Sequence, residues 1–443
     1  PPPPPPPPPP FFFQAEAGFR HRSVSRGLGD VYKRQDAHGN YVFPGLVDSH
    51  SHLGDPGYGD VESVECATAA AAVGGFTTCI DMPNNVPTIL NAERFRKKLI
   101  RMEKESLVDY ALYGALVKNN QDKLKEMHDS GAAAFKSFLH CGGGDFTYPT
   151  MYEMMLALRE IEKFDGLACI HCEDTSINEG LLQNMITKKL NSRQAFLDSR
   201  PLYSEMIATK NLIELSRATG CRIQICHVSH PDVAKAISDA RKEGVNVTGE
   251  TCVHYLVFTE KDLLEKGCTF KCAPPLRSQE ASDELWKYVE DGTLVSIGSD
   301  HSAGLLEQRD DSIHPVYELG NGISGMQTVL QSFFHKAIHV RGNSPTLITQ
   351  RMSAGPAKRF RLYGRKGAIL PGFDADLVIL DPEKEWEVKA KDLCYLQKFS
   401  AFEGMKGKGL PVLTMLRGTV VAKDYKPCAQ HGFAQFIKPI SKE

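Results

Sequence analysis

Four histidines and one aspartate carry the clearest chemical signal in the sequence. His50 and His52 stand in the run PGLVDSHSHL, and a spacing of two places both side chains on the same face of an extended strand. His171, His227 and Asp300 each follow a separate short apolar run. Imidazole and carboxylate groups bind zinc and similar ions, and ligands from different strands meet at the carboxyl end of a parallel barrel. One such histidine alone would indicate a structural role, but the repeated placement predicts a metal centre.

Lys136 is a further candidate because it lies within the apolar run AAAFKSF. A charged group in an apolar strand is costly unless it is paired or chemically modified. From the residues alone, an ion-paired or snorkelling lysine remains the alternative interpretation.

The pattern His-x-His, Lys, His, His, Asp resembles the amidohydrolase superfamily, in particular its branch of cyclic amidases. That branch contains dihydropyrimidinases, hydantoinases, allantoinases and dihydroorotases. The resemblance covers roughly residues 36–440 and rests on the runs PGLVDSHSHL, GGFTT, APPLR and GSDHS. It implies a metal-dependent hydrolase that opens a cyclic amide.

The same resemblance implies a binuclear centre in which a lysine is N6-carboxylated and its carbamate bridges two divalent metal ions. Zinc is the expected metal, although cobalt, manganese and iron also suit this mixture of donors. Asp300 is expected to act as general base toward water and then as general acid toward the departing ring nitrogen. The ligands carried over to this chain are His50, His52 and Asp300 for one ion, His171 and His227 for the other, and Lys136 as the bridge.

Other motif positions bear on the substrate. Dihydroorotase-like enzymes carry an arginine two residues after the second motif histidine, where it clamps a substrate carboxylate, but Gly54 stands there in this chain. Dihydropyrimidinase-like enzymes follow the lysine strand with a tyrosine, which the run LHCGGG at 139–144 lacks. The runs DPG, HCED and ETCVHY look most like the allantoin-hydrolysing members. The expected substrate-binding residues are Ala273, Asn321 and Gly322.

The resemblance therefore implies hydrolysis of allantoin to allantoate. The alternative is a hydantoinase or dihydropyrimidinase that acts on 5-substituted hydantoins or dihydropyrimidines. A non-catalytic scaffold is a third, less favoured reading, because scaffolding relatives have lost metal ligands and all six ligand positions are filled here. The resemblance also implies a homotetramer.

Short apolar runs alternate with amphipathic stretches from residue 42 onward, which indicates a parallel α/β fold. Eight repeats favour a (β/α)8 TIM-type barrel over an open doubly wound sheet. The predicted helices include 61–73, 93–105, 152–164, 204–219, 233–242 and 282–291. The predicted strands are 42–47, 76–81, 110–116, 132–138, 167–171, 222–227, 246–250 and 294–299.

Three segments follow from this pattern. Residues 1–35 begin with ten prolines and show no amphipathic period, so they are expected to be a low-complexity segment, either artefactual or disordered. Residues 36–365 are expected to form the barrel, and residues 366–443 a small β-sandwich appendage. Because the N-terminal half of that appendage looks missing or replaced, the strands near 368–380 are expected to lack pairing partners.

The composition of the chain limits the classes of partner that it is expected to bind. The 52 basic and 54 acidic residues give a formal net charge of -2, without a basic stripe for nucleic acid. No apolar run reaches the roughly 20 residues of a membrane span. Twelve cysteines spread singly through the chain suit reduced thiols. These features predict a cytoplasmic enzyme acting on a small molecule, with no nucleic-acid or membrane partner.

Overall fold

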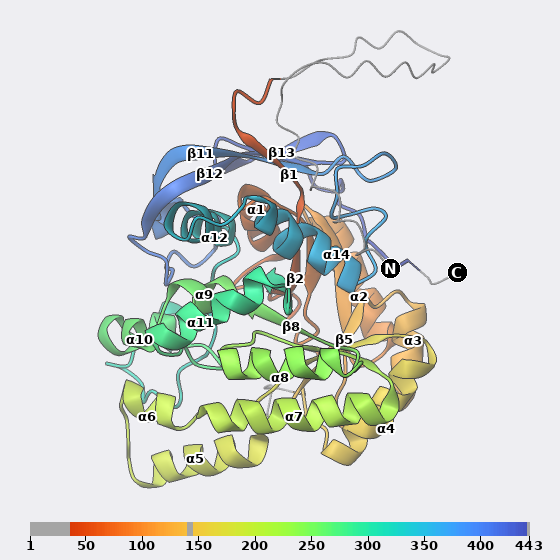
Figure 1. Ribbon diagram of the computed structural model, residues 1–443, viewed down its shortest axis with the longest axis vertical. Helices are drawn as coiled ribbons and strands as arrows, with labels where there is room; N and C mark the ends of the chain where they lie inside the picture. Colours follow the sequence, from red (N-terminus) through yellow and green to blue (C-terminus); the bar gives the residue numbers. More distant parts are fainter. Residues whose placement is uncertain (1–35, 140–144, 441–443) are drawn as a thin grey trace, which may run out of the picture.

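The computed structural model describes residues 36–139 and 145–440. Residues 1–35 lie outside the described residues, and so does most of the run LHCGGG, which has no tyrosine after the lysine strand. A curled parallel sheet surrounded by helices forms the larger part of the molecule, and a second, antiparallel sheet covers one end (Figure 1). This arrangement confirms the predicted barrel with a β appendage.

The parallel sheet has the strand order β10-β2-β3-β4-β5-β6-β7-β8-β9. Helices follow most of its strands, as the repeating pattern predicted. The strands are β2 (Leu46–His52), β3 (Phe76–Asp81), β4 (Asp109–Ala115), β5 (Ala134–Phe138), β6 (Leu167–His171), β7 (Arg222–Ile225), β8 (Val247–Cys252), β9 (Leu294–Gly298) and β10 (His301–Ser302). The main helices are α1 (Val64–Val73), α2 (Ala92–Glu105), α3 (Leu124–Asp129), α4 (Met151–Lys163), α5 (Thr175–Thr187), α6 (Arg193–Asp198), α7 (Leu202–Thr219), α8 (Pro231–Lys242), α9 (Val253–Val257), α10 (Glu260–Lys266), α11 (Gln279–Glu290), α12 (Val329–Phe334), α13 (Thr346–Thr349) and α14 (Gly355–Arg359).

The last barrel strand is broken at Ser299 and Asp300. Its first part, β9, pairs with β8, and its second part, β10, pairs with β2 through His301 and Ser302. Asp300 has a φ of 44°, a left-handed conformation that is uncommon for a residue other than glycine. The break therefore closes the barrel and sets Asp300 at its carboxyl end.

The predicted first strand, 42–47, is wrong in one respect, because it divides into two strands that belong to different sheets. β1 (Tyr41–Pro44) joins the antiparallel sheet, and β2 begins the barrel. Gly45 lies between them, where a Cβ atom would come within 2.2 Å of Thr77 Oγ1. Only glycine permits so close an approach of the backbone to the neighbouring strand.

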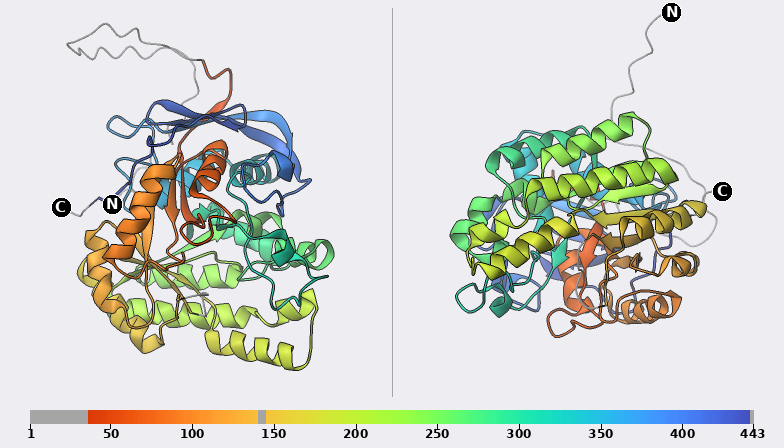
Figure 2. Two further views of the ribbon diagram at one scale, coloured as in Figure 1. Left: turned by 180° about the vertical axis from the view of Figure 1, so that it is seen from behind. Right: turned by 90° about the horizontal axis from the view of Figure 1, so that it is seen from below.

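The antiparallel sheet has the order β1-β11-β12-β13-β14. The expectation of unpaired strands near 368–380 is wrong, because β11 (Leu377–Glu387) is bordered on both sides, by β1 and by β12 (Lys406–Leu416). Residues 41–44 supply the missing neighbour. β13 (Thr419–Lys423) and β14 (Lys426–Pro427) complete the sheet, and α1 and α12 lie between it and the barrel (Figures 1 and 2).

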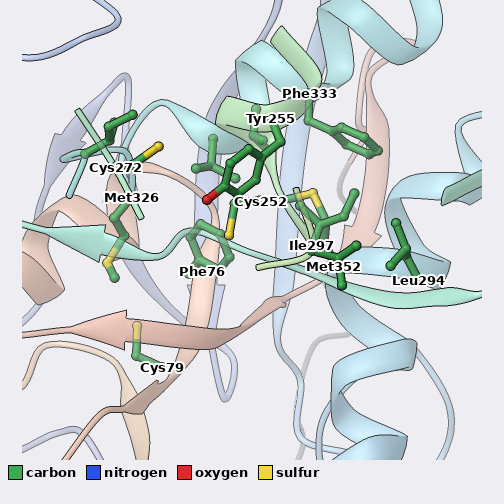
Figure 3. Close-up of a cluster of buried hydrophobic side chains, with 14 of the residues drawn as sticks. Phe76, Cys79, Cys252, Tyr255, Cys272, Leu294, Ile297, Met326, Phe333 and Met352 are labelled. Atoms are coloured by element: carbon green, nitrogen blue, oxygen red, sulfur yellow. The ribbon is translucent and has the colours of Figure 1, made fainter. Parts of the chain in front are cut away.

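Apolar side chains fill the space between the barrel strands and the surrounding helices. In α4 the buried residues Met154, Ala157, Leu158 and Ile161 recur every three or four positions, so one stripe of the helix faces the core. Figure 3 shows another part of this core, where side chains from several strands and helices pack together. Within the described ranges, no helix is long and apolar enough to cross a membrane.

Candidate metal centre

The carboxyl ends of β2 and β9 bring His50, His52 and Asp300 together. Asp300 Oδ1 lies 3.2 Å from Nε2 of His50 and 3.2 Å from Nε2 of His52. Each of the three residues offers one donor atom within 4.8 Å of the others. His50 is 1% exposed and Asp300 8%, whereas the His52 side chain is 17% exposed, so the group is open to solvent only on the side of His52. Two imidazoles and a carboxylate at such distances suit one divalent ion.

His171 and His227 form the second half of the arrangement. His171 ends β6 and His227 follows β7, and their ring centroids are 4.5 Å apart. The His227 ring is also 5.3 Å from that of His50, which joins the two halves. His227 has a φ of 37°, so both it and Asp300 are held in an uncommon backbone conformation. Such conformations concentrate at functional sites.

Lys136 enters the same space from β5. Its side chain is fully buried, and Nζ has no hydrogen-bond partner among the residues that the structure describes. The nearest contact given for Nζ is the face of the Phe138 ring, 4.8 Å from its centroid. Burial without a charged partner favours a modified or metal-bound lysine over the ion-paired alternative. His227 Nδ1 likewise lacks a hydrogen-bond partner in the described part of the chain. Two buried nitrogen atoms without a partner beside the His50, His52 and Asp300 group fit a bound metal.

Side chains behind the histidines fix the direction of each ring. His50 Nδ1 lies 2.6 Å from Glu250 Oε1, and His52 Nδ1 lies 2.7 Å from Asn84 Oδ1. With Nδ1 bonded, the Nε2 atom of each ring is the one presented to Asp300. Sequence reasoning missed these supporting roles, although an acidic residue at the end of an apolar strand, as Glu250 is, was a usable signal.

His171 is held in a different way. Its Nε2 lies 2.7 Å from Glu173 Oε2, and Arg200 Nη1 donates to the same carboxylate oxygen. The roles of Glu173 and Arg200 were not predicted from the sequence. A carboxylate or carbonyl partner is the usual means of orienting a metal-binding imidazole.

Electrostatics around the centre favour the positively charged form of the His50 ring. Burial and Lys136 lower the pKa of His50, but Asp300 and Glu250 more than offset them and raise it to about 10. Burial raises the pKa of Asp300, yet His50, His52 and His227 outweigh this and hold it well below the ordinary value. Burial, His171 and Lys136 hold the pKa of His227 well below its usual range, so that ring is neutral, the form that binds metals.

A cleft of about 230 Å³ opens beside His52. Gly54 lines it, with a φ of 74°, and a Cβ atom there would lie 3.0 Å from the carbonyl oxygen of Glu62. Asn85 and Gln308 also line this space. The cleft is therefore a mixed polar and apolar space that reaches one of the predicted metal ligands.

The predicted substrate-binding residues lie on neighbouring loops and not on the lining of this cleft. Gly322 donates its N–H to the carbonyl of Lys271 at 2.9 Å, which ties it to the chain just before Ala273. Asn321 accepts a hydrogen bond from Arg309 through its carbonyl oxygen at 3.2 Å. Ile323, which follows Gly322, forms a β-bridge with His301 in the last barrel strand. The structure brings these residues to the same end of the barrel as the ligands, beside Lys271 and His301.

Comparisons with known proteins agree with this arrangement. The model of the amidohydrolase family matches residues 41–421. The chain is 35% identical over 407 residues to L-hydantoinase of Paenarthrobacter aurescens, covering 91% of this chain and 88% of that protein. It is 32% identical over 425 residues to allantoinase of Salmonella newport (strain SL254), covering 95% and 92%. The solved L-hydantoinase (dihydropyrimidinase) from Arthrobacter aurescens has a TM-score of 0.90 at 33% identity, covering 94% of this chain and 92% of that one.

Proposed function

Because the chain belongs to the amidohydrolase family, we propose that it hydrolyses a ring carbon–nitrogen bond of a cyclic amide at the centre described above. The observation that carries the proposal is the convergence of six side chains from five parts of the barrel on one buried point. They are His50, His52, Lys136, His171, His227 and Asp300.

These residues fit two divalent ions, with zinc as the first choice. His50, His52 and Asp300 would hold one ion, and His171 and His227 the other. Lys136, as N6-carboxylysine, would bridge them, since addition of carbon dioxide to Nζ with loss of a proton turns the unpaired amine into an anionic ligand. When bound, the ions supply Lewis-acid chemistry, lowering the pKa of water and polarising a carbonyl.

The chain's own contribution is proton transfer and orientation. Asp300, whose carboxylate is ionised and shared between His50 and His52, accepts a proton from the attacking water and delivers it to the departing ring nitrogen. Glu250 and Asn84 keep the two imidazoles in the required tautomer and direction. Burial of His50 and Asp300 limits their contact with bulk water and strengthens their electrostatic interactions.

Allantoin is the substrate we propose. Gly54 supplies no cation to the cleft, which argues against a substrate carboxylate and for a neutral ring. Asn85 Oδ1 is buried and has no hydrogen-bond partner within the described ranges, and Gln308 lines the same cleft. Amide groups so placed suit the ureido group that distinguishes allantoin from hydantoins with apolar substituents.

Hydrolysis of 5-substituted hydantoins or dihydropyrimidines is the second candidate. The 35% identity to L-hydantoinase and the TM-score of 0.90 to the solved enzyme favour it. Apolar side chains on the cleft, among them Val61, Met82 and Val86, could also receive an apolar substituent.

Turnover of allantoin, a 5-benzyl hydantoin and dihydrouracil by one zinc-loaded sample tests the proposal. We expect the highest kcat/KM for allantoin. A higher value for the hydantoin would transfer the assignment to the second candidate. No turnover of any of the three, together with no bound metal after refolding with zinc and bicarbonate, would support the non-catalytic scaffold instead.

We further propose a cytoplasmic homotetramer. Light scattering coupled to size-exclusion chromatography measures the assembly, and a mass of one or two chains would contradict it.

A further inference from the structure

A second cavity, of about 370 Å³, lies at the end of the barrel opposite the metal centre. Arg222, the first residue of β7, and Val295, near the start of β9, line it, whereas the ligands lie where strands end. The remaining charged lining comes from Arg351, Lys358 and Arg359. No carboxylate is among the lining residues in the described part of the chain. The cavity is thus bordered by four cations.

The arginines of the cavity use only some of their N–H groups in hydrogen bonds, and the acceptors are neutral. Arg359 donates to the carbonyl of Ile223 at 2.6 Å and to Asn246 Oδ1 at 3.2 Å, while its buried Nε has no partner within the described ranges. Arg351 donates to the carbonyl of Val289 at 2.6 Å. Guanidinium groups have five donors each, so both side chains retain unused N–H groups. Carbonyl and amide acceptors do not neutralise a positive charge.

The nearby carboxylates either pair with another cation or lie too far away to form an ion pair with the cavity. Asp165 lies 4.0 Å from Arg222, but it also accepts a hydrogen bond from Arg361. Burial, and to a smaller extent the neighbouring Arg222, lower the pKa of Arg359 to about 9. Asp291 acts only at a distance on Arg351.

A purely structural role accounts for part of the cluster. Arg351 caps carbonyl groups at the carboxyl end of α11, a position that cations favour. The same reasoning does not cover Lys358, an exposed side chain at the edge of the cavity whose Nζ lies 4.8 Å from the centroid of the Tyr363 ring. Nor does it cover Arg359 Nε. Two cationic groups thus border the cavity without a structural partner for their charge.

We propose that this cavity binds a small anion with at least two negative charges, of the phosphate-ester or polycarboxylate class. Oxyanions form short, strong hydrogen bonds with guanidinium and ammonium groups, and several cations around one cavity select multivalent over monovalent anions. The site is separate from the metal centre, so it does not depend on the function proposed above.

Isothermal titration of the zinc-loaded protein with fructose 1,6-bisphosphate and, separately, with tricarballylate tests this proposal. We expect saturable binding of one or both probes, weakening as salt rises. The two arms distinguish the phosphate from the carboxylate source. Acetate and glucose serve as monovalent and uncharged controls, and neither should bind.

The Arg351→Gln/Lys358→Gln double variant should weaken binding by about tenfold or more, the loss expected for two charge-assisted hydrogen bonds. A charge-matched control, Arg96→Gln/Lys104→Gln, removes two exposed cations from α2 and should leave binding unchanged. The thermal midpoint of each variant is measured alongside its affinity, so that a folding defect is not mistaken for a loss of binding. Arg359→Lys, which keeps the positive charge, is included in the same comparison. Absence of saturable binding, or equal affinity in the double variant and the wild type, would overturn the proposal.

Discussion

Glu250 Oε1 lies 2.6 Å from Nδ1 of His50, and both side chains are fully buried. The other oxygen of Glu250 accepts a hydrogen bond from Ser49 at 2.5 Å. The carboxylate is therefore fixed from two directions and holds the imidazole with Nε2 toward Asp300. Such a partner both orients a ligand and raises its basicity.

Replacement of Glu250 by glutamine should reduce metal affinity by about 10- to 100-fold, because the amide keeps the shape but loses the charge. Metal content after dialysis against a graded chelator measures the effect. Ser296→Ala is the control, since Ser296 reaches the same carboxylate only at 3.5 Å. Equal metal retention in Glu250→Gln and the wild type would contradict the proposed supporting role.

Replacement of Lys136 by methionine should abolish carbamate formation while leaving the barrel folded, since methionine fits an apolar strand. Carbon-13 NMR of zinc-loaded protein equilibrated with labelled bicarbonate should show a carbamate signal in the wild type that the variant lacks. Circular dichroism of the same samples checks the fold. A signal of equal strength in Lys136→Met would place the carbamate elsewhere.

Asp300→Asn should lower kcat by about 10²- to 10⁴-fold, because an amide cannot accept and return the proton. Metal content should fall less than turnover, since an amide oxygen can still serve as a weak ligand. The exposed Asp122→Asn is the matched control. Normal kcat in Asp300→Asn would remove Asp300 from the proton-transfer role.

The sequence predicted the parts of the fold that repeat. Each apolar run from 76 onward corresponds to a strand, because parallel strands buried on both faces read as continuous apolar segments. The division of 42–47 at Gly45 escaped prediction, since periodicity does not say that one run serves two sheets. The same oversight produced the wrong expectation of an unpaired β11.

The ligand candidates were visible because strand ends are local in sequence, whereas their supports are not. Glu250 meets His50 across 200 positions of the chain, and Asn84 meets His52 across 32. No spacing rule connects such pairs. The residues that line the cleft, such as Asn85, depend on how loops fold over the barrel, which no local pattern in the sequence specifies.

Gly322→Ala should lower kcat/KM, and it should also cost about 1 kcal/mol or more of stability, because alanine is strained where φ is positive. Gly322 has a φ of 120°, and a Cβ atom would lie 2.6 Å from that of Ser302, beside the last barrel strand. The loop must shift to relieve the contact. Gly372→Ala is the matched control, because Gly372 has a φ of 92° and an added Cβ would meet nothing within 4 Å. Equal kcat/KM values for the two variants would show that the loop does not contribute to substrate binding.

Lys271 should make the folded protein more stable as the pH rises above neutrality. Its side chain is 2% exposed, and its Nζ donates to the carbonyl of Leu319 at 2.5 Å. Burial, Arg200 and Arg309 lower its pKa from 10.5 to about 7. Between these values the unfolded chain binds a proton that the folded chain does not, so the free energy of unfolding rises with pH, by at most about 1.4 kcal/mol per pH unit.

Urea unfolding of the wild type and Lys271→Met between pH 7 and 9 measures this contribution. Methionine cannot be protonated, so the stability difference between the two proteins should move in favour of the wild type by up to about 2–3 kcal/mol over that interval. The exposed Lys261→Met should keep the wild-type dependence on pH. Parallel stability curves for the wild type and Lys271→Met would mean that the buried amine keeps its proton in the folded state, with the carbonyl of Leu319 and the adjacent Phe196 ring compensating for its burial.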